Sequence, residues 1–245
     1  MVQKTGRGWS RTDCAVWIGQ SCLPGSRLFG VPSFPMIRHL YIAGVHSSRK
    51  GELVWSVARK LDWHAVPRRP REELIDGALI ERLQHGDRSA YSVLHERLHA
   101  RYRASIGEWR LHRRLTRRYA GIHISDRSPF DVHCYRKALL RLGWVENSAC
   151  EECRGYEARV LRAVTASCGV FLDAALSTLT AEFKNRGMDR LRPIEYRSGY
   201  LATAAVEFRI AYSRLVAEST RWGIIRRPDP ERAVRALLGI VELQP

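Results

Sequence analysis

Residues 39–54 read HLYIAGVHSSRKGELV, and this stretch decides how the chain is organised. HLYIAGV (39–45) is a short apolar run that ends close to a glycine, which is typical of a buried strand that enters a tight turn. In KGELVWSVARKL (50–61) the apolar residues recur at helical spacing; they are Leu53, Val54, Val57, Ala58 and Leu61. The sequence therefore predicts a strand, a loop and an amphipathic helix.

The loop GVHSSRKG (44–51) partly matches the phosphate-binding pattern G-x-x-x-x-G-K-[ST]. In that pattern the glycines turn backbone N–H groups toward phosphates, the lysine reaches phosphate oxygens and the hydroxyl binds Mg²⁺. Gly44 and Lys50 are correctly placed, but Arg49 replaces the second glycine and Gly51 replaces the hydroxyl residue. A side chain at position 49 costs about 1 kcal/mol if the backbone needs a positive φ. The nucleotide site that we predict consists of Gly44, His46, Ser47, Ser48, Arg49, Lys50 and Gly51.

A second polar group follows the apolar run AGIHIS (120–125), which we predict to be a strand. In HISDRSPFDVHCY (123–135), Asp126, Arg127 and Ser128 come at the carboxyl end of that strand, where open α/β sheets bind ligands. The aspartate can hold Mg²⁺ or a nucleophilic hydroxyl, and the arginine can bind a phosphate in bidentate fashion. The alternative is a simple turn in which Asp126 caps a helix that begins at Pro129.

A third group of basic residues lies in EFKNRGMDRLRPIEYR (182–197). Arginines on a segment above a phosphate site neutralise charge during phosphoryl transfer and exclude water on closure. A solvated basic loop is the alternative. The lid candidates are Arg186, Arg190, Arg192 and Arg197.

The remaining apolar runs alternate between strand and helix patterns. We expect strands at 63–67 and 168–174, and helices at 71–119, 129–144 and 151–164, the first with breaks near Gly86 and Gly107. Strands that alternate with helices pair in parallel through right-handed crossovers. The predicted class is therefore α/β, with a central parallel sheet and helices on both faces.

Together these motifs resemble the P-loop nucleoside and nucleotide kinases of the thymidylate-kinase-like and deoxynucleoside-kinase-like type, with the related AAA-type small ATPases. SDRSPFDVHCY (125–135) is similar to that family's DRSPLDVLAY segment, and MDRLRPIEYR (188–197) to its DGVRP-x-D-x-EYR lid. PERAVRALLGIV (230–241) is similar to the family's last helix. The resemblance runs from about Met36 to Glu242. It implies a three-layer P-loop NTPase fold that binds ATP and Mg²⁺.

The resemblance also implies roles for single residues. Lys50 would bind the phosphates, Asp126 would be the metal-side or acceptor-side carboxylate, and Arg127 would hold an acceptor phosphate. The sequence departs from the family in VPRRPREEL (66–74), because Arg68 stands where related kinases carry a glutamate. Together with Arg49 and Gly51, this makes three chemically demanding positions that differ.

The leading interpretation is a nucleotide-binding, P-loop kinase-like protein that transfers the γ-phosphoryl group of ATP to a nucleoside, a nucleotide or a similar small acceptor. The first alternative is a catalytically impaired relative that acts as a nucleotide sensor or scaffold. Both interpretations use the same loop, and they differ in whether the three departures abolish turnover.

A second alternative is a nucleic-acid-binding protein, because the formal net charge is +16. In HERLHARYRASIGEWRLHRRLTRRYAG (95–121), arginines interleave with Tyr102, Trp109 and Tyr119, as stacking platforms require. Glu96 and Glu108 interrupt this run, which also fits a solvated helix face. Only five of the 41 basic residues are lysines, so a coding preference for arginine also explains the charge.

Residues 1–35 show no sustained hydrophobic period, and we expect a disordered leader or an extension from an upstream start codon. The folded domain is then 36–245, and removal of 1–35 should leave it intact. Six cysteines without a secretory leader fit a reduced, cytoplasmic protein. No run reaches the roughly 18 apolar residues of a membrane helix, so we expect no membrane partner. The sequence carries no signal for an oligomeric state.

Overall fold

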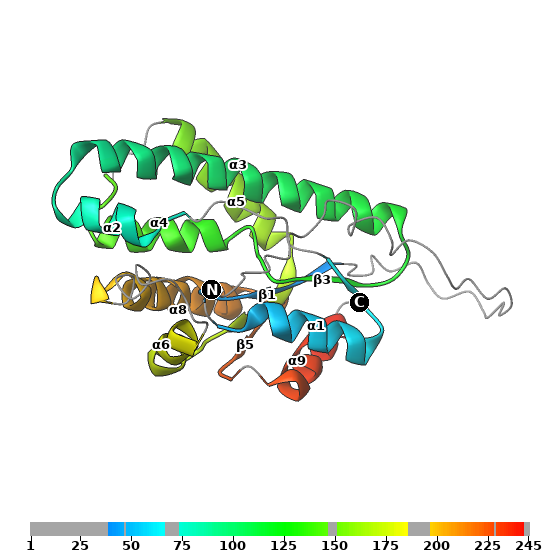
Figure 1. Cartoon of the computed structure of the whole chain (residues 1–245). Coiled ribbons are helices and arrows are strands. Elements are labelled where there is room, and N and C mark those ends of the chain that lie inside the picture. The colour runs from blue at the N-terminus through cyan, green and yellow to red at the C-terminus, as the bar shows by residue number, and fades with distance from the viewer. Residues whose placement is uncertain are drawn as a thin grey trace, which may run out of the picture. The chain divides into compact units, whose positions relative to one another are not determined.

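The computed structural model describes residues 39–46, 48–66, 74–146, 151–185, 197–227 and 229–242, with only the backbone of 151–153. Within them a parallel sheet of five strands forms in the order β2-β3-β1-β4-β5 (Figure 1). All neighbouring strands pair in parallel. The strands are β1 (His39–Ala43), β2 (His64–Ala65), β3 (His123–Ser125), β4 (Cys168–Leu172) and β5 (Trp222–Ile225). The predicted leader, 1–35, lies outside the described residues and stays a prediction.

Helices connect the strands. They are α1 (Lys50–Leu61), α2 (Gly77–Gln84), α3 (Arg88–Arg118), α4 (Asp131–Arg141), α5 (Glu151–Thr165), α6 (Leu176–Asn185), α8 (Tyr200–Glu218) and α9 (Pro230–Glu242). In the described part of the chain, no helix combines the length and the apolar character that crossing a bilayer would take. The sequence did not predict α8 or β5.

One of the two predicted helix breaks is confirmed and the other is wrong. Gly86 has φ 72°, a left-handed conformation that ends α2, and Asp87 then caps α3 by accepting a hydrogen bond of 2.8 Å from the Ser89 amide. At Gly107, by contrast, α3 continues without interruption for 31 residues. Ser105 and Ile106 are buried beside this glycine, so packing outweighs the low helix propensity of one residue.

The strands alternate their side chains between two separate cores. Leu40 and Ile42 of β1 belong to a core that α1 and α9 cover, whereas Tyr41 and Ala43 face a larger core built with α3, α4 and α8. Figure 1 shows the same arrangement, with α1 and α9 on one side of the sheet and α3 and α4 on the other. The predicted α/β class, with helices on both faces, is confirmed.

The strand order brings the predicted motifs to one edge of the sheet. β1 lies between β3 and β4, and because all three strands are parallel, their carboxyl ends share an edge. The loop after β1 therefore lies beside the turn after β3. Two segments about 80 residues apart in the sequence become neighbours.

Candidate nucleotide site

The loop after β1 is held tightly against the sheet. A Cβ atom at Gly44 would lie 3.0 Å from Ser48 Oγ and 3.3 Å from the carbonyl oxygen of Leu172 in β4. Real Cβ atoms seldom approach other atoms so closely, so a side chain at position 44 would have to push these neighbours aside by a few tenths of an ångström. Ser48 itself is buried at the base of the loop. Ser47, also predicted for this site, lies outside the described residues.

Arg49 adopts the left-handed conformation that the second glycine of the pattern would provide. Its φ is 59° and its ψ is 17°, directly before α1 begins. The guanidinium is exposed and pairs with Glu52 at 2.6 Å and with Glu182 of α6 at 3.6 Å. Exposed pairs of this kind contribute about 0–1 kcal/mol each. The backbone strain at Arg49, which the sequence indicated, is therefore present, and surface pairs offset it only in part.

Lys50 is the first residue of α1, and its side chain folds back over the loop. Its Nζ donates a hydrogen bond of 2.9 Å to the carbonyl oxygen of Val45. The ammonium group therefore lies above the loop, next to the amino terminus of α1. Both the ammonium and the helix terminus favour an anion at this place.

Asp126 lies next to Gly51, although 75 residues separate them in the sequence. The carboxylate is buried at the end of β3, and a Cβ at Gly51 would lie 3.5 Å from its Oδ2. That distance is an ordinary van der Waals contact, so a Cβ atom fits at position 51. A hydroxyl at position 51 would then lie beside a carboxylate. The chain has the Asp126 carboxylate but, with glycine at position 51, not the hydroxyl.

The turn after Asp126 separates a structural residue from a binding candidate. Ser128 Oγ accepts a hydrogen bond of 3.1 Å from the Phe130 amide at the start of α4. Ser128 therefore supports the turn that leads into α4, which begins at Asp131. Arg127 is half-buried, and its Nη1 is a buried donor without a hydrogen-bond partner among the described residues. A buried, unpaired guanidinium donor is costly unless an anion binds to it.

An aromatic anchor that the sequence analysis missed holds the side of the loop. Tyr135 Oη accepts a hydrogen bond of 2.9 Å from the His46 amide and lies 3.0 Å from His46 Nδ1, with the rings stacked 5.3 Å apart. Burial raises the pKa of Tyr135 above its usual value, so the hydroxyl stays protonated. Tyr200 and Phe183 also contact the His46 ring, at 5.6 and 6.4 Å between centroids. The loop is therefore fixed from α4, α6 and α8.

Most of the predicted lid lies outside the described residues, including Arg186, Arg190 and Arg192. Arg68, in the segment after β2, also lies outside them. Arg197 is described and exposed. The first part of the predicted lid, 182–185, belongs to α6 and reaches the loop through the Glu182–Arg49 and Phe183–His46 contacts. Helix α6, which leads into the predicted lid, therefore contacts the loop 44–51.

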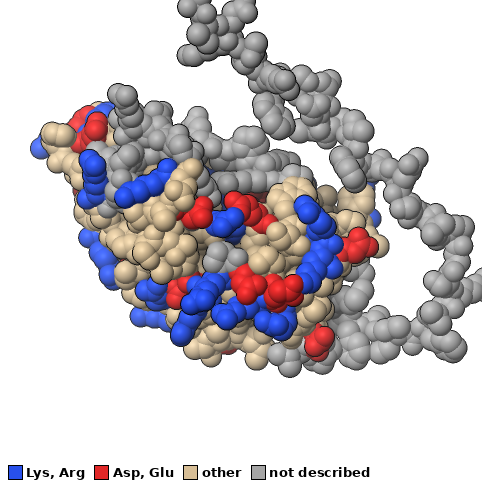
Figure 2. All heavy atoms as spheres, turned by 60° about the horizontal axis from the view of Figure 1, so that its bottom comes forward, with Lys and Arg blue, Asp and Glu red and all other residues tan. Residues whose placement is uncertain are grey.

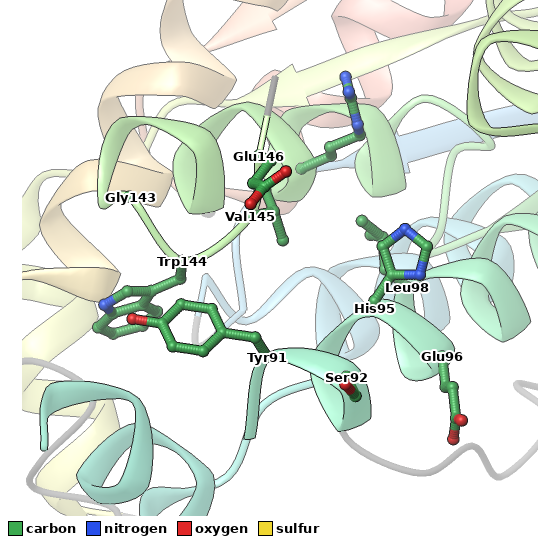
Figure 3. Close-up of a pocket in the computed structure, with 10 residues that line it drawn as sticks. Tyr91, Ser92, His95, Glu96, Leu98, Gly143, Trp144, Val145 and Glu146 are labelled. Carbon is green, nitrogen blue, oxygen red and sulfur yellow. The ribbon is translucent and has the colours of Figure 1, made fainter. Parts of the chain in front are cut away.

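A separate cavity of about 500 Å³ lies between the amino-terminal half of α3 and the segment after α4 (Figure 3). Tyr91 and Trp144 lie at one end of it, and His95 lies at the other. Neither the loop nor Asp126 and Arg127 line this cavity. Trp144 also contacts Tyr200, which contacts His46, so rings connect the cavity wall to the loop.

No protein family model and no curated protein matches the chain. Among solved structures, it is similar to the deoxyadenosine kinase of M. mycoides with bound dATP. The TM-score is 0.58 at 13% identity, over 83% of this chain and 99% of that one. The same enzyme with the products dCMP and dCDP gives a TM-score of 0.58 at 12% identity. With bound dCTP, the TM-score is 0.53 at 13% identity. Each match covers 83% of this chain and 98% of that one.

At identities near 13% the likeness concerns the fold and not the chemistry. The similarity covers most of the parallel sheet with helices on both faces that the structure describes. The chain therefore has the three-layer α/β fold of P-loop kinases.

Proposed function

We propose that the chain binds a nucleoside triphosphate at the loop 44–51 and transfers its γ-phosphoryl group to a nucleoside, a nucleotide or a similar small acceptor. The observation that carries this proposal is the meeting of three groups at one edge of the sheet. They are the loop with Lys50, the Asp126 carboxylate beside position 51, and the unpaired Nη1 of Arg127.

Phosphate binding would rest mainly on the backbone. The loop residues precede the amino terminus of α1, where free N–H groups and the helix dipole attract anions. The Lys50 ammonium would exchange its hydrogen bond to Val45 for one to a phosphate oxygen, at little cost because it already lies over the loop. Nothing in this step depends on the residues at positions 49 or 51.

The acceptor would bind on the side of β3. Arg127 would pair its buried donor with an anionic group of the acceptor, and this orients the acceptor toward the loop. In the described residues, no group of three or more metal-ligating side chains gathers. Asp126 would therefore hold Mg²⁺ with phosphate and water oxygens, and the metal, when bound, neutralises the charge that develops during transfer.

A second candidate function, nucleotide binding without turnover, is supported by positions 49 and 51. Arg49 keeps the loop in a strained conformation, and Gly51 provides no hydroxyl beside Asp126. Both features weaken the positioning of a metal more than they weaken the attraction of phosphate. The two candidates thus differ in rate and not in the site that they use.

A calorimetric titration of ATP, with and without Mg²⁺, tests the proposal on the full chain. The double variant Arg49→Gly with Gly51→Thr reverses both departures, and the Cβ atom that it adds at position 51 lies at an ordinary contact distance, 3.5 Å, from Asp126 Oδ2. We expect the wild type to bind ATP and the double variant to gain Mg²⁺-dependent affinity of about tenfold or more, with phosphoryl transfer.

Adding Lys50→Ala to the double variant should remove that gain. If the double variant gains affinity but transfers no phosphoryl group to nucleosides or nucleoside monophosphates, the non-catalytic function is the correct one. If wild type and double variant both fail to bind millimolar ATP, the loop is a simple connection between strand and helix, and both candidates are wrong.

A further inference from the structure

We infer that the carboxyl-terminal half of α3 binds the sugar-phosphate backbone of a single-stranded nucleic acid. This surface, which we call the α3 arginine face, consists of Arg103, Arg110, Arg113, Arg114 and Arg117. It shares no residue with the loop 44–51 or with Asp126 and Arg127. The inference is therefore independent of the proposed kinase function.

The five arginines form one continuous stripe. At 3.6 residues per turn they fall within an arc of about 100° on the helix, and Arg103 to Arg117 spans about 21 Å along its axis. All five are exposed, and α3 lies on the outer side of its layer of helices (Figure 1). With one phosphate per 3.4 Å of a stacked strand, the stripe matches about six phosphates.

No carboxylate neutralises this stripe within the described part of the chain. None of the five arginines takes part in an ion pair there. Glu108 is the acidic residue nearest in sequence, and it lies on the opposite side of the helix, where its charge acts on buried Tyr41. Glu96 lies about two turns before Arg103 and lines the cavity of Figure 3. The two acids that interrupt the sequence therefore do not interrupt the surface.

The other side of the sheet carries a different pattern of charge. Figure 2 brings the side of α1 and α9 forward, where basic and acidic side chains lie next to one another. Lys60 of α1 pairs with Glu231 of α9, and Arg232 lies 3.5 Å from Asp229. Exposed arginines outside any described ion pair also occur on that side, for example Arg59 of α1 and Arg235 of α9. The difference is that α3 aligns five such arginines along one face of a single helix.

Aromatic rings beside the stripe favour a single strand over a duplex. Arg113 lies over the Trp109 ring at 5.0 Å, and Arg118 lies over the Tyr119 ring at 5.7 Å. Tyr119 is 40% exposed at the end of α3. Exposed rings stack unpaired bases, whereas the bases of a duplex already stack on one another.

The test uses fluorescence anisotropy with labelled 20-nucleotide single strands of RNA and of DNA, at several salt concentrations. One variant carries Arg→Gln at the five positions of the α3 arginine face. A matched control carries Arg→Gln at Arg59, Arg214, Arg221, Arg226 and Arg235, which are exposed elsewhere. Both variants lose five positive charges, so only the location of the charge differs.

We expect the wild type to bind with a slope of log K against log salt near −3.5, which is about −0.7 for each of five phosphates. The α3 variant should lose about 100-fold or more in affinity at 0.1 M salt, and the control less than about fivefold. Tyr119→Ala should lose about tenfold with the slope unchanged. Stronger binding of the RNA strand would identify contacts to the 2′-hydroxyl, and equal binding would identify phosphate and stacking contacts alone.

Equal losses in the α3 variant and the control would overturn the inference, because binding would then follow total charge. Tighter binding to a DNA duplex, to anionic lipid vesicles or to polyglutamate than to either single strand would also overturn it. Circular dichroism and thermal melting of both variants establish that they are folded, since all ten positions are exposed.

Discussion

The loop after β1 and the turn after β3 lie at the same edge of the sheet, yet they are built in different ways. In the proposed function the loop would bind phosphate through its backbone, the amino terminus of α1 and one ammonium group. The turn would bind through two side chains at the end of β3, Asp126, which is buried, and Arg127, which is half-buried.

This difference explains which departures from the phosphate-binding pattern the fold can tolerate. Backbone N–H groups attract phosphate whatever the neighbouring side chains are, so the loop accommodates Arg49 and Gly51. The turn after β3 has no comparable contribution from its backbone, because its chemistry depends on the identity of each side chain. We therefore expect substitutions in the turn to change ligand binding most, and substitutions in the loop to change it less.

The largest effect should follow Arg127→Ala. A charge-assisted, bidentate contact contributes about 1.5–3 kcal/mol, so the affinity for a nucleoside monophosphate acceptor should fall by about 10- to 150-fold. The melting temperature should stay within about 2 °C, because the variant removes a donor that has no partner among the described residues. Calorimetry with individual nucleoside monophosphates measures the affinity.

Two controls accompany Arg127→Ala. Arg127→Lys keeps the positive charge but loses the planar guanidinium that binds two oxygens at once. It should therefore recover part of the affinity for the nucleoside monophosphate. Arg235→Ala removes an exposed arginine of α9 and should change nothing. Unchanged binding in Arg127→Ala would show that the turn is structural only.

Tyr135→Phe should have an intermediate effect, because it removes the hydroxyl that anchors the loop and keeps the ring. The His46 amide loses its partner, so the stability should fall by about 1–2 kcal/mol, and the melting temperature by about 2–8 °C. ATP affinity should fall as well, since the freed loop must be ordered on binding.

Tyr212→Phe is the matched control for Tyr135→Phe. It also removes a buried hydroxyl, which donates a hydrogen bond of 2.8 Å to Asp131. Tyr212, however, does not contact the loop. It should lower the melting temperature to a similar extent and leave ATP affinity unchanged. If both variants lose ATP affinity equally, the effect is one of global stability, and Tyr135 has no specific role.

Local patterns predicted the parts of the fold that local chemistry controls. The apolar run HLYIAGV (39–45) and the helical spacing after Lys50 predicted β1 and α1, and both are confirmed. The left-handed conformation at position 49 also followed from the motif alone. Each of these features depends on residues within one turn or one strand.

The features that the sequence analysis missed depend on contacts between residues far apart in the sequence. Tyr135 meets His46 across 89 positions, and no spacing in the sequence reveals that contact. The helix continues through Gly107 because the core covers its neighbours. The α3 arginine face was visible as a run of arginines, but only the fold shows that Glu108 points to the other side.

The smallest effect should follow Arg49→Gly, which tests the loop alone. An L-residue in the left-handed region costs about 1–2 kcal/mol, and glycine loses about 0.5–1 kcal/mol through the entropy of the unfolded chain. The difference is a gain of about 0.5–1 kcal/mol, or about 1–4 °C in melting temperature. The loss of the weak pairs to Glu52 and Glu182, about 0–1 kcal/mol each, reduces this gain.

Asp62 provides the matched control for Arg49→Gly, because it is the other described non-glycine residue with a positive φ, at 53°. It ends α1, on the side away from the phosphate-binding loop. Asp62→Gly should raise the melting temperature by less, since aspartate tolerates the left-handed region better than arginine does. Only Arg49→Gly should change ATP binding, by about threefold or less, because the loop keeps the same backbone conformation. A loss of stability in Arg49→Gly would mean that its pairs to Glu52 and Glu182 outweigh the backbone strain, and that the loop depends on its side chains as much as the turn after β3 does.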